Sequence, residues 1–220
     1  MPIHSNIQIM KKIIKLLLFL TPSWGAGGLF AQNTDTTDTG VVINGVTWAT
    51  RNVDAPGTFA KTPESAGMFY QWNRKKGWSA TEPAAWIKVD NWDTTTSTGI
   101  MWEKANDPSP VGWRVPTEEE QRTLLDTAKV TNKWTTQNNV NGRKFTDKAT
   151  GNSLFFPAVG SRIHDTGELS DTDEFGFYWG ATIDENYRNL AFHLFVCEGY
   201  VGVYGCNGNE GFSIRPVLAK

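Results

Sequence analysis

Three residues near the C-terminus, His193, Cys197 and Cys206, have the side chains best suited to chemistry. Thiols can form a disulfide in an exported protein, bind zinc together with histidine, or act as nucleophiles when their pKa is lowered. A zinc site is incomplete here because His193 is the only histidine nearby, and its side of the strand is already aromatic. We therefore expect no metal ion.

Carboxylates form two further candidate sites. Glu118, Glu119 and Glu120 could act as general acids, but Thr117 and Glu120 have the spacing of a helix N-cap with its capping box. This pattern predicts a helix running to about residue 127 or 128 and explains the glutamates. The acidic loop 165–174 does not match an EF-hand, so we interpret it as a solvated loop. The chain has no nucleophile elbow, His-Glu-x-x-His motif or phosphate loop, so we predict neither an enzyme nor a cofactor.

The segment that positions His193 and the cysteines alternates like a β-hairpin. Its aliphatic phase runs through Leu190, Phe192, Leu194 and Val196 and resumes at Val201 and Val203. The two residues Glu198-Gly199 have the chemistry of a tight turn. The predicted cross-strand pairs are Val196 with Val201, Cys197 with Tyr200, Phe195 with Gly202, and His193 with Tyr204.

This register separates the two cysteines. Cys206 lies level with Ala191, six positions from Cys197, which corresponds to roughly 20 Å along a strand. A disulfide needs Cα atoms within roughly 7 Å of each other. We therefore predict two unpaired thiols.

The two faces of this hairpin differ in character. One face is aliphatic and is explained as core. The other face mixes His, Phe, Cys, Tyr and Gly, which fits neither a core nor a charged solvent face. Either a loop covers this face and its aromatic residues are packing residues, or the face presents aromatic anchors to a partner. The alternation alone favours neither interpretation. Residues 204–211, rich in Gly and Asn, would extend the face as a loop suited to polar contacts.

The rest of the chain predicts one exported domain. Its 220 residues have a formal charge of -2, 10 Trp and 2 Cys. Residues 1–31 have lysines before a short apolar run and a small-residue cleavage site, so we predict a signal peptide and no membrane span. Removing them reduces the 21 basic residues to 18 against 23 acidic ones, a mature charge of -5, which argues against nucleic acid as a partner. No lipid-anchoring cysteine follows, so we expect a secreted or cell-surface protein.

The remaining boundaries follow from composition. Residues 32–40 are polar and predict a flexible linker, and residues 41–220 form the domain. Asn44-Gly45 predicts a hairpin between strands at 41–43 and 46–48. Short β-type runs occur at 69–72 and at 154–160, and the stretch 73–97 predicts a long loop pinned by tryptophans.

Several segments, in this order, resemble the Fibrobacter succinogenes major paralogous domain of exported Bacteroidetes proteins. They are Gly45-Val46-Thr47-Trp48-Ala49-Thr50-Arg51-Asn52-Val53, Phe69-Tyr70-Gln71-Trp72, Gly112-Trp113-Arg114-Val115-Pro116-Thr117, Gly142-Arg143-Lys144-Phe145, Phe177-Tyr178-Trp179 and Gly211-Phe212-Ser213-Ile214-Arg215-Pro216-Val217. The resemblance implies an α+β, C-type-lectin-like fold with short antiparallel strands, one or two helices and long Trp-pinned loops. Ser109 and Gln121 depart from the family pattern, in which Cys and Trp are common.

The C-terminus is similar to the variable proteins of diversity-generating retroelements, which display a diversified ligand-binding face on a fixed aliphatic framework. The slots that this resemblance assigns to the ligand are Asp184, Glu185, Asn186, Tyr187, Arg188, Asn189, His193, Phe195, Cys197, Tyr200, Gly202, Tyr204, Cys206, Asn207, Asn209 and Glu210. These slots agree with the mixed face, and favour binding over packing. Phe195, Tyr200 and Tyr204 would be the anchors, with His193 and residues 207–210 as polar contacts.

The resemblance therefore implies a recognition protein that binds an unknown protein or glycan. The calcium tripeptides of sugar-binding C-type lectins are absent from the sequence, so calcium-dependent sugar binding is not supported. One alternative is a structural or fimbrial surface module, whose exposed aromatics would cause self-association. A second is an enzyme related to formylglycine-generating enzymes, which would need a reactive cysteine with a lowered pKa.

Overall fold

Short strands separated by turns make up most of the structure. The computed structural model describes residues 35–187 and 190–220. The predicted signal peptide, residues 32–34 of the linker, Arg188 and Asn189 lie outside this part. The elements in chain order are β1 (Val41–Ile43), β2 (Val46–Trp48), β3 (Met68–Tyr70), β4 (Gly77–Ser79), β5 (Trp113–Arg114), α2 (Glu118–Thr123), β6 (Val130–Gln137), β7 (Val140–Asp147), β8 (Ser153–Pro157), β9 (Val159–Arg162), β10 (Leu169–Thr172), β11 (Gly176–Ile183), β12 (Leu190–Val196), β13 (Val201–Asn207) and β14 (Val217–Leu218).

The α+β, C-type-lectin-like fold class is a wrong prediction. Of the residues that the structure describes, 40% are in strands and 3% in helix, and none of their helices has seven or more residues. The physical reason is visible at α2. Thr117 caps this helix with the predicted capping box, but the helix ends at Thr123, after which Leu124 and Leu125 donate to carbonyls three residues earlier and the α-helical bonding stops. The next residues form a turn closed by Val130 N–H donating to Asp126, which leads directly into β6.

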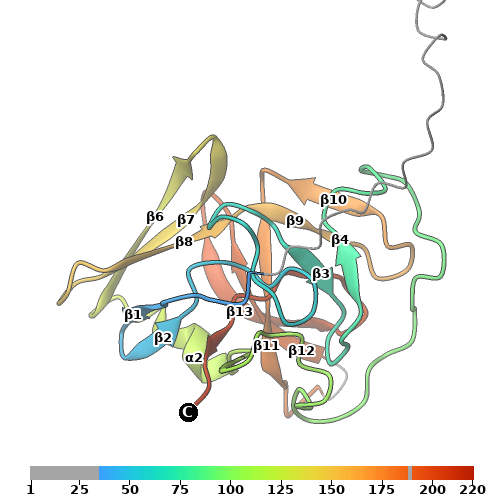
Figure 1. Cartoon of the computed structure of the whole chain (residues 1–220), viewed down its shortest axis with the longest axis horizontal. Coiled ribbons are helices and arrows are strands. Elements are labelled where there is room, and N and C mark those ends of the chain that lie inside the picture. Colours follow the sequence, from blue (N-terminus) through green and yellow to red (C-terminus); the bar gives the residue numbers. More distant parts are fainter. Residues whose placement is uncertain (1–34, 188–189) are drawn as a thin grey trace, which may run out of the picture. The chain divides into compact units, whose positions relative to one another are not determined.

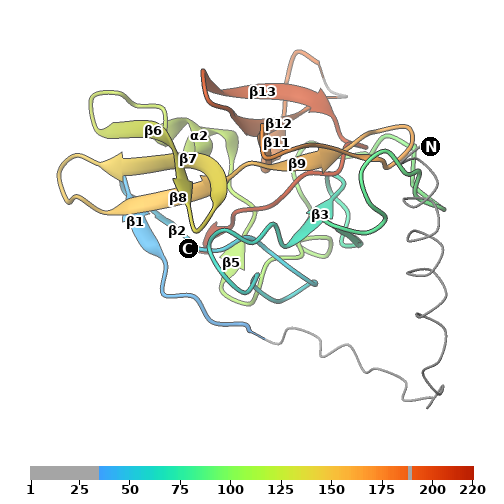
Figure 2. The same ribbon diagram turned by 90° about the horizontal axis from the view of Figure 1, so that it is seen from above.

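The strands are arranged in four sheets, with the strand orders β1-β2-β14-β5, β10-β9-β11-β12-β13, β3-β4 and β6-β7-β8. Figure 1 labels most of these strands. Pairing is antiparallel except between β9 and β11, which run parallel at Gly160 and Gly176. The predicted N-terminal hairpin is confirmed by the pairing of Ile43 with Val46 across a turn in which Asn44 and Gly45 both have positive φ. Figure 2 shows β13 at the edge of its sheet, beyond β12 and β11.

Only part of the stretch 73–97 follows its prediction. It contains β4, and the rings of Trp78 and Trp92 pack with their centroids 4.8 Å apart. Trp86, in contrast, is 69% exposed, so its side chain does not anchor the loop as predicted. The predicted strand within 154–160 is confirmed by β8, in which Leu154, Phe155 and Phe156 are buried.

Two apolar clusters lie on opposite faces of the β11–β12–β13 ladder. One includes Leu194, Val196 and Val203 and continues to Trp48 and Phe156. The other includes Trp179, Ala191 and Phe212 and continues to Trp72 and Trp102. The sheet that carries the predicted binding face therefore packs against apolar side chains on both of its faces.

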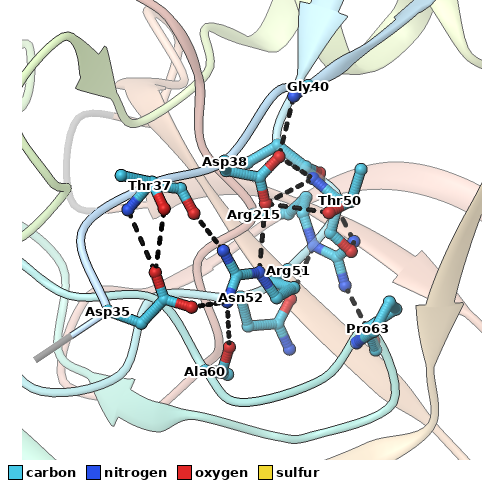
Figure 3. A network of polar contacts seen from close by, with 11 residues as sticks. Asp35, Thr37, Asp38, Gly40, Thr50, Arg51, Asn52, Ala60, Pro63 and Arg215 are labelled. Atoms are coloured by element: carbon cyan, nitrogen blue, oxygen red, sulfur yellow. Dashed lines mark hydrogen bonds and ion pairs between the residues drawn. The ribbon is translucent and has the colours of Figure 1, made fainter. Parts of the chain in front are cut away.

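A buried arginine anchors the C-terminal segment, as Figure 3 shows. Arg215 is fully buried and donates from Nε to Asn52 Oδ1 at 2.8 Å and from Nη1 to the Thr50 carbonyl at 2.6 Å. Its guanidinium also lies 5.1 Å from the centre of the Phe156 ring. Burial lowers the pKa of Arg215 to about 10, so the side chain is still charged at neutral pH. The preceding residues 211–214 are bound to the rest of the domain by their own backbone hydrogen bonds, among them those of Phe212 with Tyr70 and of Ser213 with Phe177.

Residues 35–40, assigned to a flexible linker from composition, make specific contacts with the domain. The Asp38 carboxylate accepts the N–H groups of Gly40 and Thr50, the Thr50 hydroxyl and Arg51 Nε. Asp35 forms a second ion pair with Arg51 (Figure 3). The described residues belong to one compact unit.

Candidate binding face on the C-terminal hairpin

The hairpin of β12 and β13 has the predicted register. His193 pairs with Tyr204, Phe195 with Gly202, and Val196 with Val201. The Cys197 N–H donates to the Tyr200 carbonyl at 2.9 Å, which closes the turn at 198–199. Alternation and turn chemistry are short-range signals, and both are satisfied here without a bulge between the two strands.

The aliphatic face is core, as predicted. Leu194 and Val196 are fully buried and Val203 is 7% exposed. These side chains pack against the cluster that contains Trp48 and Phe156. The half-buried Phe192 and Val201 pack against the same cluster, and the intervening residues of the hairpin point to the opposite face.

That opposite face is half covered and half open. Phe212, whose backbone is hydrogen-bonded to Tyr70, stacks on Phe177 and packs on Trp179 and His193, with ring centroids 4.8, 4.4 and 5.0 Å away. The cover does not extend to the outer strand, where Tyr200 and Tyr204 are 51% and 42% exposed. Each of the two interpretations left open by the sequence therefore describes a different part of the same face.

His193 belongs to the covered half. Its side chain is 6% exposed, and its Nδ1 has no hydrogen-bond partner within the described part of the chain. Burial lowers the pKa of His193 to about 4, so the imidazole is neutral at physiological pH. The structure thus puts His193 in the packing beneath Tyr204 instead of among the polar contacts predicted for it.

Tyr200 and Tyr204, here called the tyrosine pair, form the open half. The Tyr204 hydroxyl donates to the Tyr200 hydroxyl, and the ring centroids are 5.9 Å apart. This hydrogen bond raises the pKa of Tyr204. Gly202 lies between them, and a Cβ there would sit 2.8 Å from the Tyr204 hydroxyl and 2.9 Å from the Tyr200 hydroxyl. A side chain at position 202 would therefore force the two rings apart.

Phe195 forms the border between the covered and open halves. It is half-buried, and its ring lies 5.5 Å from Phe175 and 5.2 Å from Phe177. Sequence reasoning did not assign these two neighbours to the site. The alternation of Phe175, which directly precedes β11, with Phe177 and Trp179 within it is the signal that could have identified them.

The loop before β12 adds exposed side chains. Glu185, Asn186 and Tyr187 are exposed, and Tyr187 is 64% exposed. The half-buried Asp184 accepts the N–H groups of Asn186 and Tyr187 and so shapes the turn. Arg188 and Asn189 lie outside the described residues.

The loop after β13 uses its polar groups internally. Asn209 is buried, and its amide donates to the carbonyls of Thr94 and His164 at 3.2 and 3.3 Å. Glu210 Oε1 lies 3.0 Å from His164 Nδ1, and burial raises the pKa of Glu210. Among the polar residues of this loop, Asn207 is the exposed one. The polar contacts predicted for 207–210 are thus reduced to Asn207.

The cysteines are half-buried free thiols six register positions apart. Burial raises the pKa of the Cys206 thiol, which disfavours its reactive thiolate form. Beside Cys197, Arg143 from β7 donates to the carbonyls of Cys197 and Glu198 and holds the hairpin turn, a role that the sequence did not indicate. The described residues contain no group of three or more His, Cys, Asp or Glu arranged for a metal ion.

The comparisons with known proteins add no relatives: no family model, curated protein or solved structure matches this chain. In the part of the chain that the structure covers, no helix is long and apolar enough to cross a membrane.

Proposed function

We propose that this is an exported recognition protein that binds a protein or glycan partner through the open half of the hairpin face. The tyrosine pair supplies the anchors, and Asn186, Tyr187 and Asn207 are further exposed residues at slots that the resemblance assigns to the ligand. The segments that resemble the Fibrobacter succinogenes major paralogous domain and the retroelement variable proteins support this proposal. So does the predicted signal peptide, which would bring the domain to the cell surface or the medium.

The distribution of tyrosines is the observation that carries the proposal. The chain has five tyrosines. Tyr70 and Tyr178 are buried, whereas Tyr187, Tyr200 and Tyr204 are the exposed ones, and all three occupy slots that the resemblance assigns to the ligand. Tyrosine provides a large, amphipathic contact area at a low cost in conformational entropy, and for this reason it dominates many binding surfaces.

The preorganisation of the anchors also favours binding. The hydroxyl contact within the tyrosine pair and the rigid ladder beneath it hold both rings before any partner arrives. Preorganised side chains lose less entropy on binding. The raised pKa of Cys206 is the observation that weighs against the formylglycine-type alternative.

The test is a binding screen of residues 32–220 on a glycan array and on an array of secreted and surface proteins. The wild-type domain is compared with the double variant Tyr200→Ser, Tyr204→Ser. Trp86→Ser is the matched control, because Trp86 is an exposed aromatic residue outside the predicted slots. We expect signals that the double variant loses and the control retains, with similar melting temperatures for all three. Signals that survive in the double variant, or the absence of any signal on both arrays, would refute the proposal.

Two further measurements address the remaining parts of the proposal. Size-exclusion chromatography distinguishes recognition from the structural alternative, because assembly through the exposed aromatics predicts self-association that the double variant abolishes. A near-copy of the 3′ end of the gene that differs only at adenines, next to a reverse transcriptase gene, would be expected if a retroelement diversifies the face.

A further inference from the structure

A second concave site lies in a different part of the domain from the tyrosine pair. Its volume is about 570 Å³, within the range typical of small-molecule sites. The walls come mainly from the segment 101–117, with Ala181 of β11 and Ala219 closing the far side. No residue of the predicted ligand slots lines it.

The lining of this pocket is largely apolar. Trp102 and Val115 are buried in its wall, and Trp113 is half-buried. At the rim, Met101 is 54% exposed and Val111 is 99% exposed. Apolar side chains this exposed beside a pocket provide surface that an apolar ligand would remove from water.

Two buried polar atoms in the lining residues have no partner. Trp102 is 7% exposed, and its Nε1 makes no hydrogen bond in the described part of the chain. The same is true of the Ser109 hydroxyl. A buried donor without an acceptor is destabilising, so a ligand oxygen that reaches either group would be favoured.

The charges around the pocket leave one cation available. The Asp107 carboxylate accepts the N–H groups of Ser109 and Val115 at 2.8 and 3.0 Å. Arg114 is held by Glu120 through two hydrogen bonds of 2.8 and 2.6 Å. The exposed Lys104 has no side-chain partner among the described residues, so its ammonium group is free to pair with an anion.

We propose that this pocket binds a small amphipathic carboxylic acid, with its apolar body against Trp102 and Trp113 and its carboxylate paired with Lys104. The apolar walls select the body of the ligand, and the unpaired ammonium group selects the acid over its neutral amide. The Trp102 indole N–H and the Ser109 hydroxyl provide additional donors for a ligand oxygen. The site is independent of the proposed recognition face, so either proposal can fail without the other.

The experiment is an NMR titration of ¹⁵N-labelled residues 32–220 with 4-phenylbutyrate and, separately, with its neutral amide. The observed signals are the indole N–H resonances, and the signal of Trp102 is identified by its loss in the variant Trp102→Phe. Trp48 is the internal control, because its Nε1 is also buried without a partner but lies in the other apolar cluster. We expect a saturable shift of the Trp102 resonance with no shift at Trp48.

Lysine variants test the proposed ligand class. Wild type should bind the acid about tenfold more tightly than the amide, the effect expected of one charge-assisted contact. Lys104→Met should abolish this preference, and the matched control Lys133→Met, on the exposed side of β6, should keep it. An unmoved Trp102 resonance, or equal affinity of wild type for acid and amide, would overturn the proposal. A Trp102 shift that follows protein concentration instead of ligand would identify a second copy of the chain as the occupant and would also overturn it.

Discussion

Acidification should destabilise this protein through one residue, His193. The imidazole is buried against Phe177, Trp179 and Phe212, with ring centroids 5.9, 6.2 and 5.0 Å away. Burial lowers its pKa from 6.5 to about 4. The informative perturbation is His193→Phe, because the surroundings already accept an aromatic ring and the unpartnered Nδ1 disappears with the substitution.

The size of the effect follows from the two pKa values. Between pH 4 and 6.5 the unfolded chain binds a proton at His193 that the folded chain does not, so the free energy of unfolding decreases as pH falls through this window. Each pH unit costs about 1.4 kcal/mol. Lowering the pH from 6.5 to 5 should therefore remove about 2 kcal/mol of stability through His193 alone.

The assay is urea unfolding of residues 32–220 at both pH values, followed by tryptophan fluorescence. His193→Phe should lose about 2 kcal/mol less than wild type on acidification, since contributions from carboxylates cancel in the comparison. His164→Gln is the matched control. His164 is the other histidine of the described chain, its side chain is 45% exposed, and its removal should leave most of the pH dependence in place. If wild type and His193→Phe lose equal stability between pH 6.5 and 5, the assignment of His193 as a buried neutral base is wrong.

The other predictions concern the binding face and its supports. Gly202→Ala should weaken ligand binding, because the added Cβ separates the tyrosine pair. It should change the free energy of unfolding by less than about 1 kcal/mol, because the atoms that the Cβ meets are exposed side-chain ends. Gly199→Ala, which has open space around its Cβ, should change neither binding nor stability in the same assays. Arg215→Leu should reduce the free energy of unfolding by at least about 3 kcal/mol, because buried acceptors lose their donor. The control Arg122→Leu, which removes an exposed ion pair, should cost under about 1 kcal/mol. Equal losses for the two variants in urea titrations would contradict the role of the buried cation. Alkylation of Cys206 by iodoacetamide in the folded protein, followed by mass spectrometry, should be at least about tenfold slower than in the unfolded protein; similar rates would show that burial does not protect the thiol.

Local signals in the sequence were sufficient for the hairpins and for the start of the helix. The hairpin of β12 and β13 follows from alternation and from the turn chemistry of Glu198-Gly199, and the N-terminal hairpin follows from Asn44-Gly45. The capping box of Thr117 and Glu120 likewise depends on residues three positions apart. In each case the interacting residues are close in sequence, so a local sequence pattern corresponds directly to a physical contact.

The fold class could not be obtained in the same way. The helix that Thr117 caps was expected to continue for about another turn, but it ends at Thr123, and the turn at Asp126 leads the chain into β6 instead. The polar linker was expected to be free, yet Asp38 contacts Thr50 and Arg51. These outcomes depend on distant parts of the chain that offer a core position or a hydrogen-bond partner.

The sequence by itself determined which residues of the hairpin share a face and that the aliphatic face is core. It did not determine how much of the mixed face stays open. That was decided by Phe212, which lies over His193 and exchanges two backbone hydrogen bonds with Tyr70, a residue more than 140 positions earlier in the chain. Alternation specifies the direction in which a side chain points, because strand geometry is local. The exposure of that side chain depends on which segment packs over it, and only the tertiary structure brings the covering segment to the sheet.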